Sequence, residues 1–313
     1  MKQLPLFLLA LLLAPVHAQA RPHFLITEIT YGPPGQTPIN PVGINNLGQV
    51  TGVLLDQHGD FYPFFYSGGQ IVEIPTGYDS SGSAINIHGV VVGGGANGYG
   101  SFIWPGTLIP FGPTNSSADA INDFGTVVGG PSAYVYKSGV VIDLGLGPES
   151  TATGINNSGQ VVGNNGSSGS GTFLWRNGHI TSLPLLNAIA INNNGDILGY
   201  IQSASGNPQP VLDVEGLLIN IPLPARATGP VEVYALNDRD HVVGTVQLNG
   251  ARIEPFLWNG RFWLLNSLIP AGSGWVLRDA EGINGKGQIV GSGTLNGIVA
   301  GYILTPLREA GTE

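Results

Sequence analysis

The chain has 313 residues, no cysteine, 49 glycines and a formal net charge of −9. Charged residues make up 10% of it, against about 25% in an average soluble protein. A hydrophobic content of 42% excludes wholesale disorder, and without cysteine the fold must be held by its core or by repeat closure. The 11 Lys and Arg residues occur singly, which argues against binding to nucleic acid.

The first 20 residues have the pattern of a secretory signal peptide. Lys2 precedes an apolar run over residues 4–13, and small residues follow up to Ala20. We expect cleavage after Ala18 or Ala20 and an exported protein, either extracellular or periplasmic. A buried N-terminal helix is the alternative. The run is shorter than the ~20 residues of a membrane-spanning helix and no later segment comes close, so we expect no membrane span in the mature chain.

Seven copies of one pattern, small–Ile–Asn–x–x–Gly–x–Val–x–Gly, follow in order along the chain. The second place, which we call the anchor, is occupied by Ile44, Ile85, Ile121, Ile155, Ile191, Leu236 and Ile283. The third place is always Asn: Asn45, Asn86, Asn122, Asn156, Asn192, Asn237 and Asn284. The closing Gly is always present, from Gly52 to Gly291. Asp240 replaces the middle Gly once. Because Asp tolerates positive φ, we expect the same tight turn in every copy.

An aromatic-rich segment and a short Gly-containing turn follow the copies, as in residues 101–109, 172–180 and 255–263. β-branched and aromatic residues with Gly and Asn at the breaks predict strands and hairpins, and no window of the mature chain shows a helical period. Each repeat therefore predicts four short strands, named a to d in chain order. Four antiparallel strands per ~40 residues are typical of a β-propeller blade. The anchors are 34 to 47 residues apart, which is too variable for the main alternative, a β-solenoid.

Small residues occupy the first and third positions before most anchors, as in Ala118 and Ala120. Both lie on one face of strand a, so we expect strand a to be innermost, where neighbouring blades approach. The last repeat supplies only strands a, b and c, ending at Leu304, whereas residues 24–29 resemble a lone strand d. We expect these ends to pair and to close an all-β, seven-bladed ring. The single domain covers residues 21–306, with 307–313 as a short tail.

The repeat resembles a known family. Ile-Asn-x-x-Gly-Gln-Val-Val-Gly followed by a Phe-Leu-Trp strand is similar to the HAF repeat of probable extracellular bacterial proteins, most closely over residues 154–163 and 265–306. The resemblance covers essentially the whole mature chain. It implies secretion and a repeat architecture, and it brings no established activity or catalytic residue. The His-Ala-Phe triplet that names the family is absent, replaced by segments such as residues 62–64. Many such chains end in an apolar sorting tail, and we expect no such anchor here.

The repeated Asn-x-x-Gly turns are superficially similar to calcium loops. Calcium needs several carboxylate or carbonyl oxygens, and most of these turns contain no acid. We therefore expect Asx-type turns, in which Asn bonds nearby backbone and Gly supplies positive φ. The turn richest in acids, residues 237–240, contains Arg239, which competes with a cation. We expect no metal and no cofactor.

Catalytic motifs are not evident. The histidines of the mature chain are dispersed without metal spacing, and the cluster around His58 reads as one solvated loop. The chain has no Gly-x-Ser-x-Gly, no cysteine nucleophile and no phosphate loop. We assign no catalytic residue and expect a protein that is not an enzyme.

The predicted topology places a–b and c–d turns on one face of the ring, and b–c and d–a loops on the other. The second set varies most in length and composition, and function usually resides on variable loops over a rigid scaffold. The loops expected on this face are residues 56–62, 94–100, 202–209, 222–232, 247–254 and 266–279. The candidate ligand residues on them are Tyr62, Tyr99, Arg226, Arg252, Trp275 and Arg278. Trp275 has a structural alternative, filling a junction between blades.

The leading hypothesis is a secreted, non-enzymatic, monomeric scaffold that binds an extracellular protein or glycan through these loops. The alternative is an extracellular carbohydrate-active hydrolase or lyase that uses acids near the axis. Asp119 and Glu281 on strand a are the starting points for that alternative, because two carboxylates are the usual catalytic pair. A purely structural component of the cell surface or matrix is a third reading.

Overall fold

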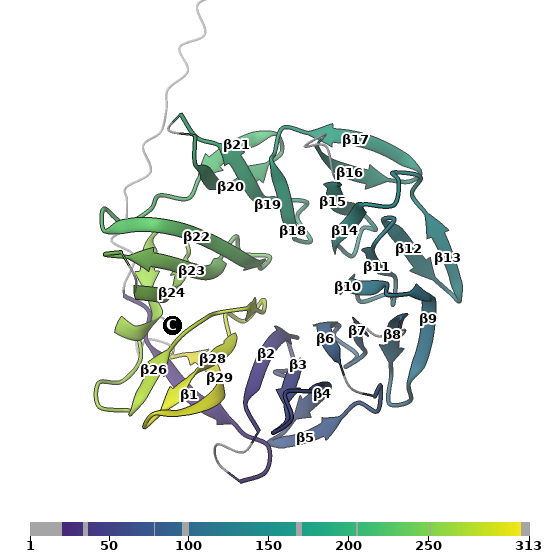
Figure 1. The fold of residues 1–313 in the computed structure, drawn as a ribbon. Coiled ribbons are helices and arrows are strands. Elements are labelled where there is room, and N and C mark those ends of the chain that lie inside the picture. Colours follow the sequence, from purple (N-terminus) through teal and green to yellow (C-terminus); the bar gives the residue numbers. More distant parts are fainter. Residues whose placement is uncertain are drawn as a thin grey trace, which may run out of the picture.

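The chain forms a ring of seven antiparallel sheets around a central axis (Figure 1). The computed structural model describes residues 21–33, 37–77, 79–95, 100–166, 171–204, 206–250 and 252–307. The predicted signal peptide and most of the tail lie outside these ranges. None of the helical segments within them is long and apolar enough to cross a membrane. The predicted seven-bladed propeller is confirmed.

Six blades each contain four consecutive strands, in the order a, b, c, d. The first three are β2 (Ile39–Ile44), β3 (Val50–Leu55), β4 (Phe61–Ser67), β5 (Gln70–Glu73); β6 (Ser80–Ile85), β7 (Val91–Gly95), β8 (Gly100–Trp104), β9 (Ile109–Thr114); and β10 (Ser117–Ile121), β11 (Val127–Gly130), β12 (Tyr134–Lys137), β13 (Val140–Asp143). The next three are β14 (Ser150–Ile155), β15 (Val161–Asn165), β16 (Thr172–Arg176), β17 (His179–Leu183); β18 (Asn187–Ile191), β19 (Ile197–Gln202), β20 (Pro208–Val214), β21 (Leu217–Asn220); and β22 (Ala227–Leu236), β23 (Val242–Leu248), β24 (Arg252–Trp258), β25 (Phe262–Leu264).

The seventh blade joins the two ends of the described chain. It contains β26 (Trp275–Leu277), β27 (Gly282–Ile283), β28 (Ile289–Leu295), β29 (Ile298–Pro306) and the N-terminal β1 (Phe24–Ile29). β1 pairs antiparallel with β29 along its whole length, as predicted. β26 and β27 both pair with β28, so strand a is interrupted here. Two predicted loops are therefore partly wrong. Loop 266–279 contains the end of a short 3₁₀ helix, η1 (Leu265–Ser267), and all of β26, and loop 222–232 contains the first six residues of β22.

Strand a carries a β-bulge in six blades. The register skips one residue, two places before the anchor, as between Ala118 and Ala120. The unpaired residues are Val42, Ser83, Asp119, Thr153, Ile189 and Tyr234. Strand a is innermost (Figure 1). Where the small residue before the anchor is Gly, it lies against strand a of the neighbouring blade, as Gly43, Gly154 and Gly282 do. A Cβ on Gly154 would lie 3.3 Å from Cα of Ala190 in the next strand a, so small residues permit this approach.

The closing Gly of each repeat lies opposite the bulge. A Cβ on Gly163 would come within 2.1 Å of the carbonyl oxygen of Thr151 on strand a, and the other six closing glycines face the same kind of collision. The glycine is therefore required because another backbone approaches closely. The middle Gly serves the turn instead. φ there is positive in every copy, including +60° at Asp240, as predicted.

The hydrophobic core lies between adjacent blades rather than at the axis. One cluster joins Val128 and Val135 of one blade to Ala152, Val161 and Phe173 of the next. Burying such side chains contributes about 1.5–3 kcal/mol each. Strands d form the rim, and β13 exposes all four of its residues. Each blade therefore depends on its neighbour, and closing the ring packs the first blade against the seventh.

Candidate functional site

The seven repeated asparagines form a closed ring of hydrogen bonds around the axis. Each Oδ1 accepts the backbone N–H groups of the residues two and four places later, as Asn45 does from Leu47 and Gln49, both at 3.0 Å. Each Nδ2 donates to the carbonyl oxygen of the asparagine in the next blade at 2.8–3.3 Å. Asn284 closes the ring onto Asn45. The predicted Asx turn is confirmed, and the same amide also joins the blades.

The acids of the repeat turns are also engaged in bonds between blades. Asp238 accepts the backbone N–H of Asn193 at 2.9 Å and its Nδ2 at 3.0 Å. Asp240 accepts from Nδ2 of Asn192 at 2.9 Å. Within the described ranges, no three His, Asp or Glu side chains are grouped so that they could hold a metal ion. These carboxylates therefore act as acceptors that connect neighbouring turns.

A cavity of about 400 Å³ lies on the axis, on the far side of the anchors from the turns. Its wall includes the residue two places before the anchor in five blades: Val42, Ser83, Asp119, Tyr234 and Glu281. Burial raises the pKa of Asp119 to about 6. Burial, then the charges of Asp279 and Glu232, raise the pKa of Glu281 to about 7. No described Lys or Arg lines the cavity, so it is an acidic cavity whose two carboxyl groups have raised pKa values.

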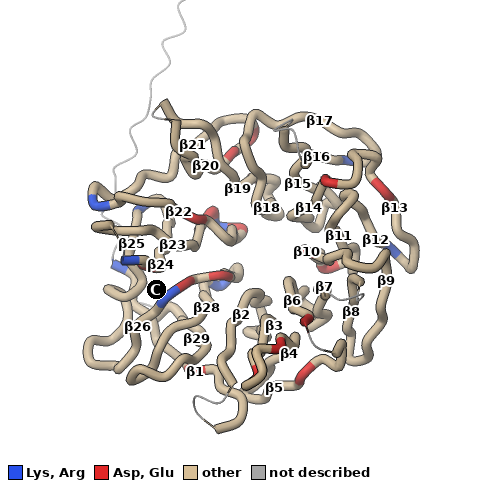
Figure 2. The backbone as a smooth tube through the Cα atoms, in the orientation of Figure 1, with Lys and Arg blue, Asp and Glu red and all other residues tan. Residues whose placement is uncertain are grey.

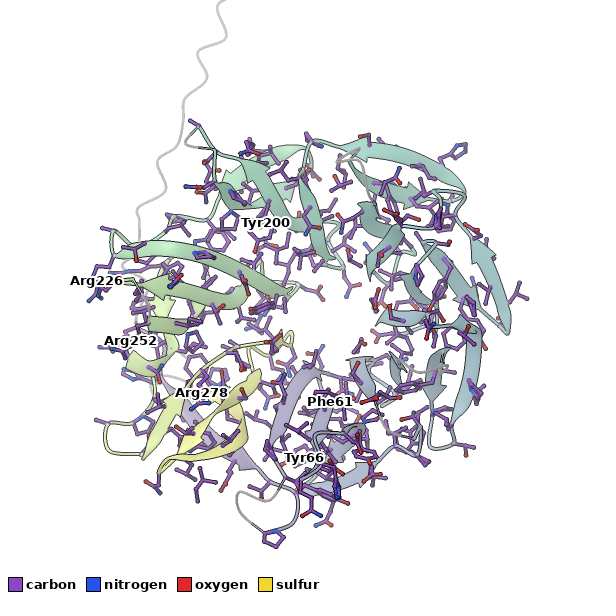
Figure 3. The ribbon with its side chains drawn as sticks, in the orientation of Figure 1. Phe61, Tyr66, Tyr200, Arg226, Arg252 and Arg278 are labelled. Atoms are coloured by element: carbon purple, nitrogen blue, oxygen red, sulfur yellow. The ribbon has the colours of Figure 1, made fainter. Side chains whose placement is uncertain are left out.

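A larger pocket of about 820 Å³ opens on the loop face, where β2, β6 and β10 begin. We call it the large pocket. Its apolar wall includes Ile39, Leu55 and Phe61, and Ser81 and Ser117 supply hydroxyl groups. Phe61 is 46% exposed, a large fraction for an aromatic side chain beside a cavity (Figure 3). The large pocket can therefore accept a ligand that is apolar on one side and forms hydrogen bonds on another.

One wall residue of the large pocket, Ser80, is buried and its hydroxyl has no hydrogen-bond partner. The corresponding serines are satisfied: Ser116 accepts the N–H of Ser101 at 3.1 Å, and Ser150 accepts that of Ala133 at 2.9 Å. In the strand facing Ser80 the equivalent residue is Pro63, which has no N–H. A proline in strand c thus explains the unpaired hydroxyl.

A smaller pocket of about 260 Å³ lies at the junction of β22, β24 and η1, and we call it the arginine pocket. Arg226 and Arg252 both line it, and Figure 3 shows them at the same edge of the ring. Arg252 is exposed and pairs with Glu254, whose side chain is only 4% exposed. Asn266 donates to the other carboxylate oxygen of Glu254 at 2.7 Å. A buried carboxylate therefore holds Arg252 in place while its guanidinium remains accessible.

The structure separates the other candidate ligand residues. Tyr62 is half-buried and packs against the core of its blade. Trp275 packs edge-to-face on Tyr302, with ring centroids 6.1 Å apart, so its structural alternative describes it better. Arg278 is exposed just after β26, and Tyr99 lies outside the described residues. The sequence did not single out Phe61 or Glu254. In a strand pattern an exposed aromatic residue cannot be told from a buried one, nor a buried acid from an exposed one.

No family model matches the chain, and no curated protein does. Among solved structures, the acylaminoacyl peptidase of Pyrococcus horikoshii aligns with a TM-score of 0.55 at 14% identity, over 87% of this chain and 52% of that one. The β-propeller domain of the Trilobed protease from Pyrococcus furiosus aligns with a TM-score of 0.55 at 12% identity, over 89% and 96%. The chain thus spans about half the length of the peptidase. These likenesses show the propeller fold alone. The P. furiosus domain is described as having an open velcro topology, whereas β1 pairs with β29 here.

Proposed function

We propose that this protein is an exported, non-enzymatic binding protein that takes its ligand in the large pocket of the loop face. The observation that carries the proposal is the pocket itself. Its volume of about 820 Å³ lies within the ~300–1,000 Å³ range of small-molecule sites. It is formed where several strands a begin, so a rigid ring holds its wall. The pattern of residues 1–20 supports export.

The chemistry of the wall indicates the kind of ligand. Apolar side chains dominate it, and short hydroxyls and amides such as Asn40 and Ser81 interrupt it. Asp79 is its only charged described residue, which disfavours an anionic ligand. An uncharged group with one apolar face and one hydrogen-bonding face fits these surroundings, such as a glycan residue or a peptide segment. Phe61 offers an aromatic surface for the apolar face.

Glycan and peptide arrays probed with the purified protein would find such ligands, and titration of the best one would measure the Kd. We expect Phe61→Ala to weaken binding about tenfold, because a buried aromatic contact contributes more than ~1 kcal/mol. Phe124→Ala is the matched control, since Phe124 is 77% exposed on the turn face. Equal Kd values for wild type and Phe61→Ala would contradict the proposal. Product formation by the wild-type chain would contradict it too and would favour the hydrolase alternative based on Asp119 and Glu281.

A further inference from the structure

Basic side chains are concentrated in two adjacent blades. Residues 30–225 contain two Lys or Arg and 11 Asp or Glu, a formal charge of −9. Residues 21–29 and 226–307 contain seven of each and are formally neutral. Figure 2 shows the basic residues near β22, β24 and β26. In an acidic protein this distribution creates one region where an anionic ligand is not repelled.

The arginine pocket lies within that region and carries an excess of positive charge. Arg226 and Arg252 line the pocket, and Arg21 donates to the carbonyl oxygen of Ser267, another of its wall residues. Glu254 is the only acid among the described wall residues, and it is bound to Arg252. No hydrogen bond or ion pair joins the Arg226 side chain to another described residue. The described wall therefore holds two guanidinium groups against one carboxylate, and the Arg21 guanidinium lies beside it on Ser267.

The geometry of the loops holds these arginines near each other. The backbone N–H of Asn249, in the b–c turn, donates to the carbonyl oxygen of Arg226 at 3.2 Å. Gly250 N–H donates to Oγ1 of Thr228 at 2.7 Å. These bonds fix the b–c turn, and hence the start of β24 at Arg252, against the start of β22. Of the two guanidiniums, that of Arg252 is also held by Glu254, so it loses less freedom when it binds a carboxylate.

The side chains of Asn266 and Ser267 in the arginine pocket already have hydrogen-bond partners. Nδ2 of Asn266 donates to Glu254 and to the carbonyl oxygen of Leu277, and its Oδ1 accepts from Leu277 N–H at 2.8 Å. Oγ of Ser267 donates to the carbonyl oxygen of Leu264 at 2.7 Å. Leu264 and Leu248 complete the wall. The pocket thus offers charge and apolar contact but few free partners for the many hydroxyl groups of a sugar.

We propose that the arginine pocket binds the carboxylates of an acidic peptide segment, with Arg226 and Arg252 as the recognising residues. Arginine pairs with carboxylates through two parallel hydrogen bonds, and the leucines suit the aliphatic stem of a Glu side chain. Glu254 is a positioning residue, because it orients Arg252. This site differs in chemistry from the large pocket, whose wall has Asp79 as its single charged described residue. It rests on the proposed function only because both place binding on the loop face.

Fluorescence anisotropy with a labelled octapeptide of alternating Glu and Leu tests the site, with the Gln–Leu octapeptide as the uncharged probe. We expect the Glu peptide to bind, the Gln peptide to bind at least tenfold more weakly, and Arg226→Gln to weaken Glu-peptide binding roughly tenfold. The affinity should also fall as salt rises, because both guanidiniums are exposed. Arg176→Gln, which changes an exposed arginine on β16, should leave the Kd unchanged.

Arg252→Gln also leaves buried Glu254 without its cation and can reduce stability, so Arg226→Gln is the deciding variant. Equal binding of the Glu and Gln peptides, or an unchanged Kd in Arg226→Gln, would overturn the proposal. Tighter binding of oligogalacturonate than of the Glu peptide would overturn the peptide assignment. If array ligands bind and lose affinity in Phe61→Ala while the Glu peptide does not bind, the arginine-pocket proposal alone is contradicted. If the Glu peptide binds through Arg226 while no array ligand depends on Phe61, the large-pocket proposal alone is contradicted.

Discussion

At the scale of single residues, a serine at the same place of the repeat is hydrogen-bonded in some blades and unpaired in another, because its partner in the preceding blade changes. Ser116 and Ser150 satisfy backbone N–H groups of the preceding blade, whereas Ser80 faces Pro63 and is unpaired. Asn at the third place of the repeat shows the opposite behaviour. Its partners are backbone atoms present in every blade, so its role is constant. The serine is satisfied only where the preceding blade supplies an N–H, whereas the Asn finds its backbone partners in every blade.

Ser116→Ala should therefore destabilise the protein where Ser80→Ala does not. The first change removes bonds with Ser101 and Pro113 and leaves a buried N–H unsatisfied, at a cost of about 1–3 kcal/mol. The second removes a hydroxyl that is already unsatisfied, so the free energy of unfolding should stay the same or rise slightly. Urea unfolding of both variants measures the difference. A similar loss in the two would show that Ser80 has a partner in solution.

At the scale of the element, strand a determines what faces the axis. Its bulge opposes the closing Gly, and the unpaired residue varies from Val42 to Asp119 and Tyr234. Glu281 takes the same place in the seventh blade, where the interruption between β26 and β27 replaces the bulge. The backbone of strand a is thus similar in every blade, while the residue two places before the anchor varies and lines the axial cavity.

Glu281 should make stability depend on pH. Its folded pKa of about 7 lies above its ordinary value of 4.5, because burial and the charges of Asp279 and Glu232 favour the protonated form. Its contribution is fully present below pH 4.5 and is lost as pH rises to about 7, since only the folded state holds the proton in that interval. Glu281→Gln should raise the free energy of unfolding at pH 8 by about 1–3 kcal/mol and flatten the slope between those pH values.

Urea unfolding at pH 5 to 8 provides the comparison. Glu73→Gln, a change on exposed β5, serves as the control and should leave the pH profile unaltered. An identical slope in wild type and Glu281→Gln would mean that Glu281 is solvated and titrates normally. Asp119, whose pKa burial raises to about 6, acts in the same direction and contributes to the remaining slope.

At the scale of the whole molecule, the ring is held by two closures. The hydrogen bond from Asn284 to Asn45 closes the inner ring, and the pairing of β1 with β29 closes the outer sheet. Phe24 and Ile29 of β1 are 2% and 0% exposed, so closure also completes two hydrophobic clusters. Because every core lies between two blades, loss of one junction affects all of them.

Deleting residues 21–31 should therefore lower the Tm of the whole ring in one cooperative step. The deletion removes a six-residue ladder and two buried side chains worth about 1.5–3 kcal/mol each. Calorimetry measures the change. The single variants Ile29→Ala and Leu25→Ala refine it, because Ile29 is buried whereas Leu25 is 54% exposed. An unchanged Tm in the deletion would contradict closure by β1.

The sequence by itself determined the repeat count, the four strands per blade, the turn at each Asn and the closure by residues 24–29, because these depend on local pattern. It also placed Arg226 and Arg252 on the loop face, and Asp119 and Glu281 on strand a near the axis. Only the tertiary structure decided which side chains meet. The Asn ring joins residues 34 to 239 positions apart, the bulge interrupts the alternation of side chains along strand a, and Trp275 packs against the core. Such contacts arise from bringing distant repeats side by side, and no local spacing encodes them.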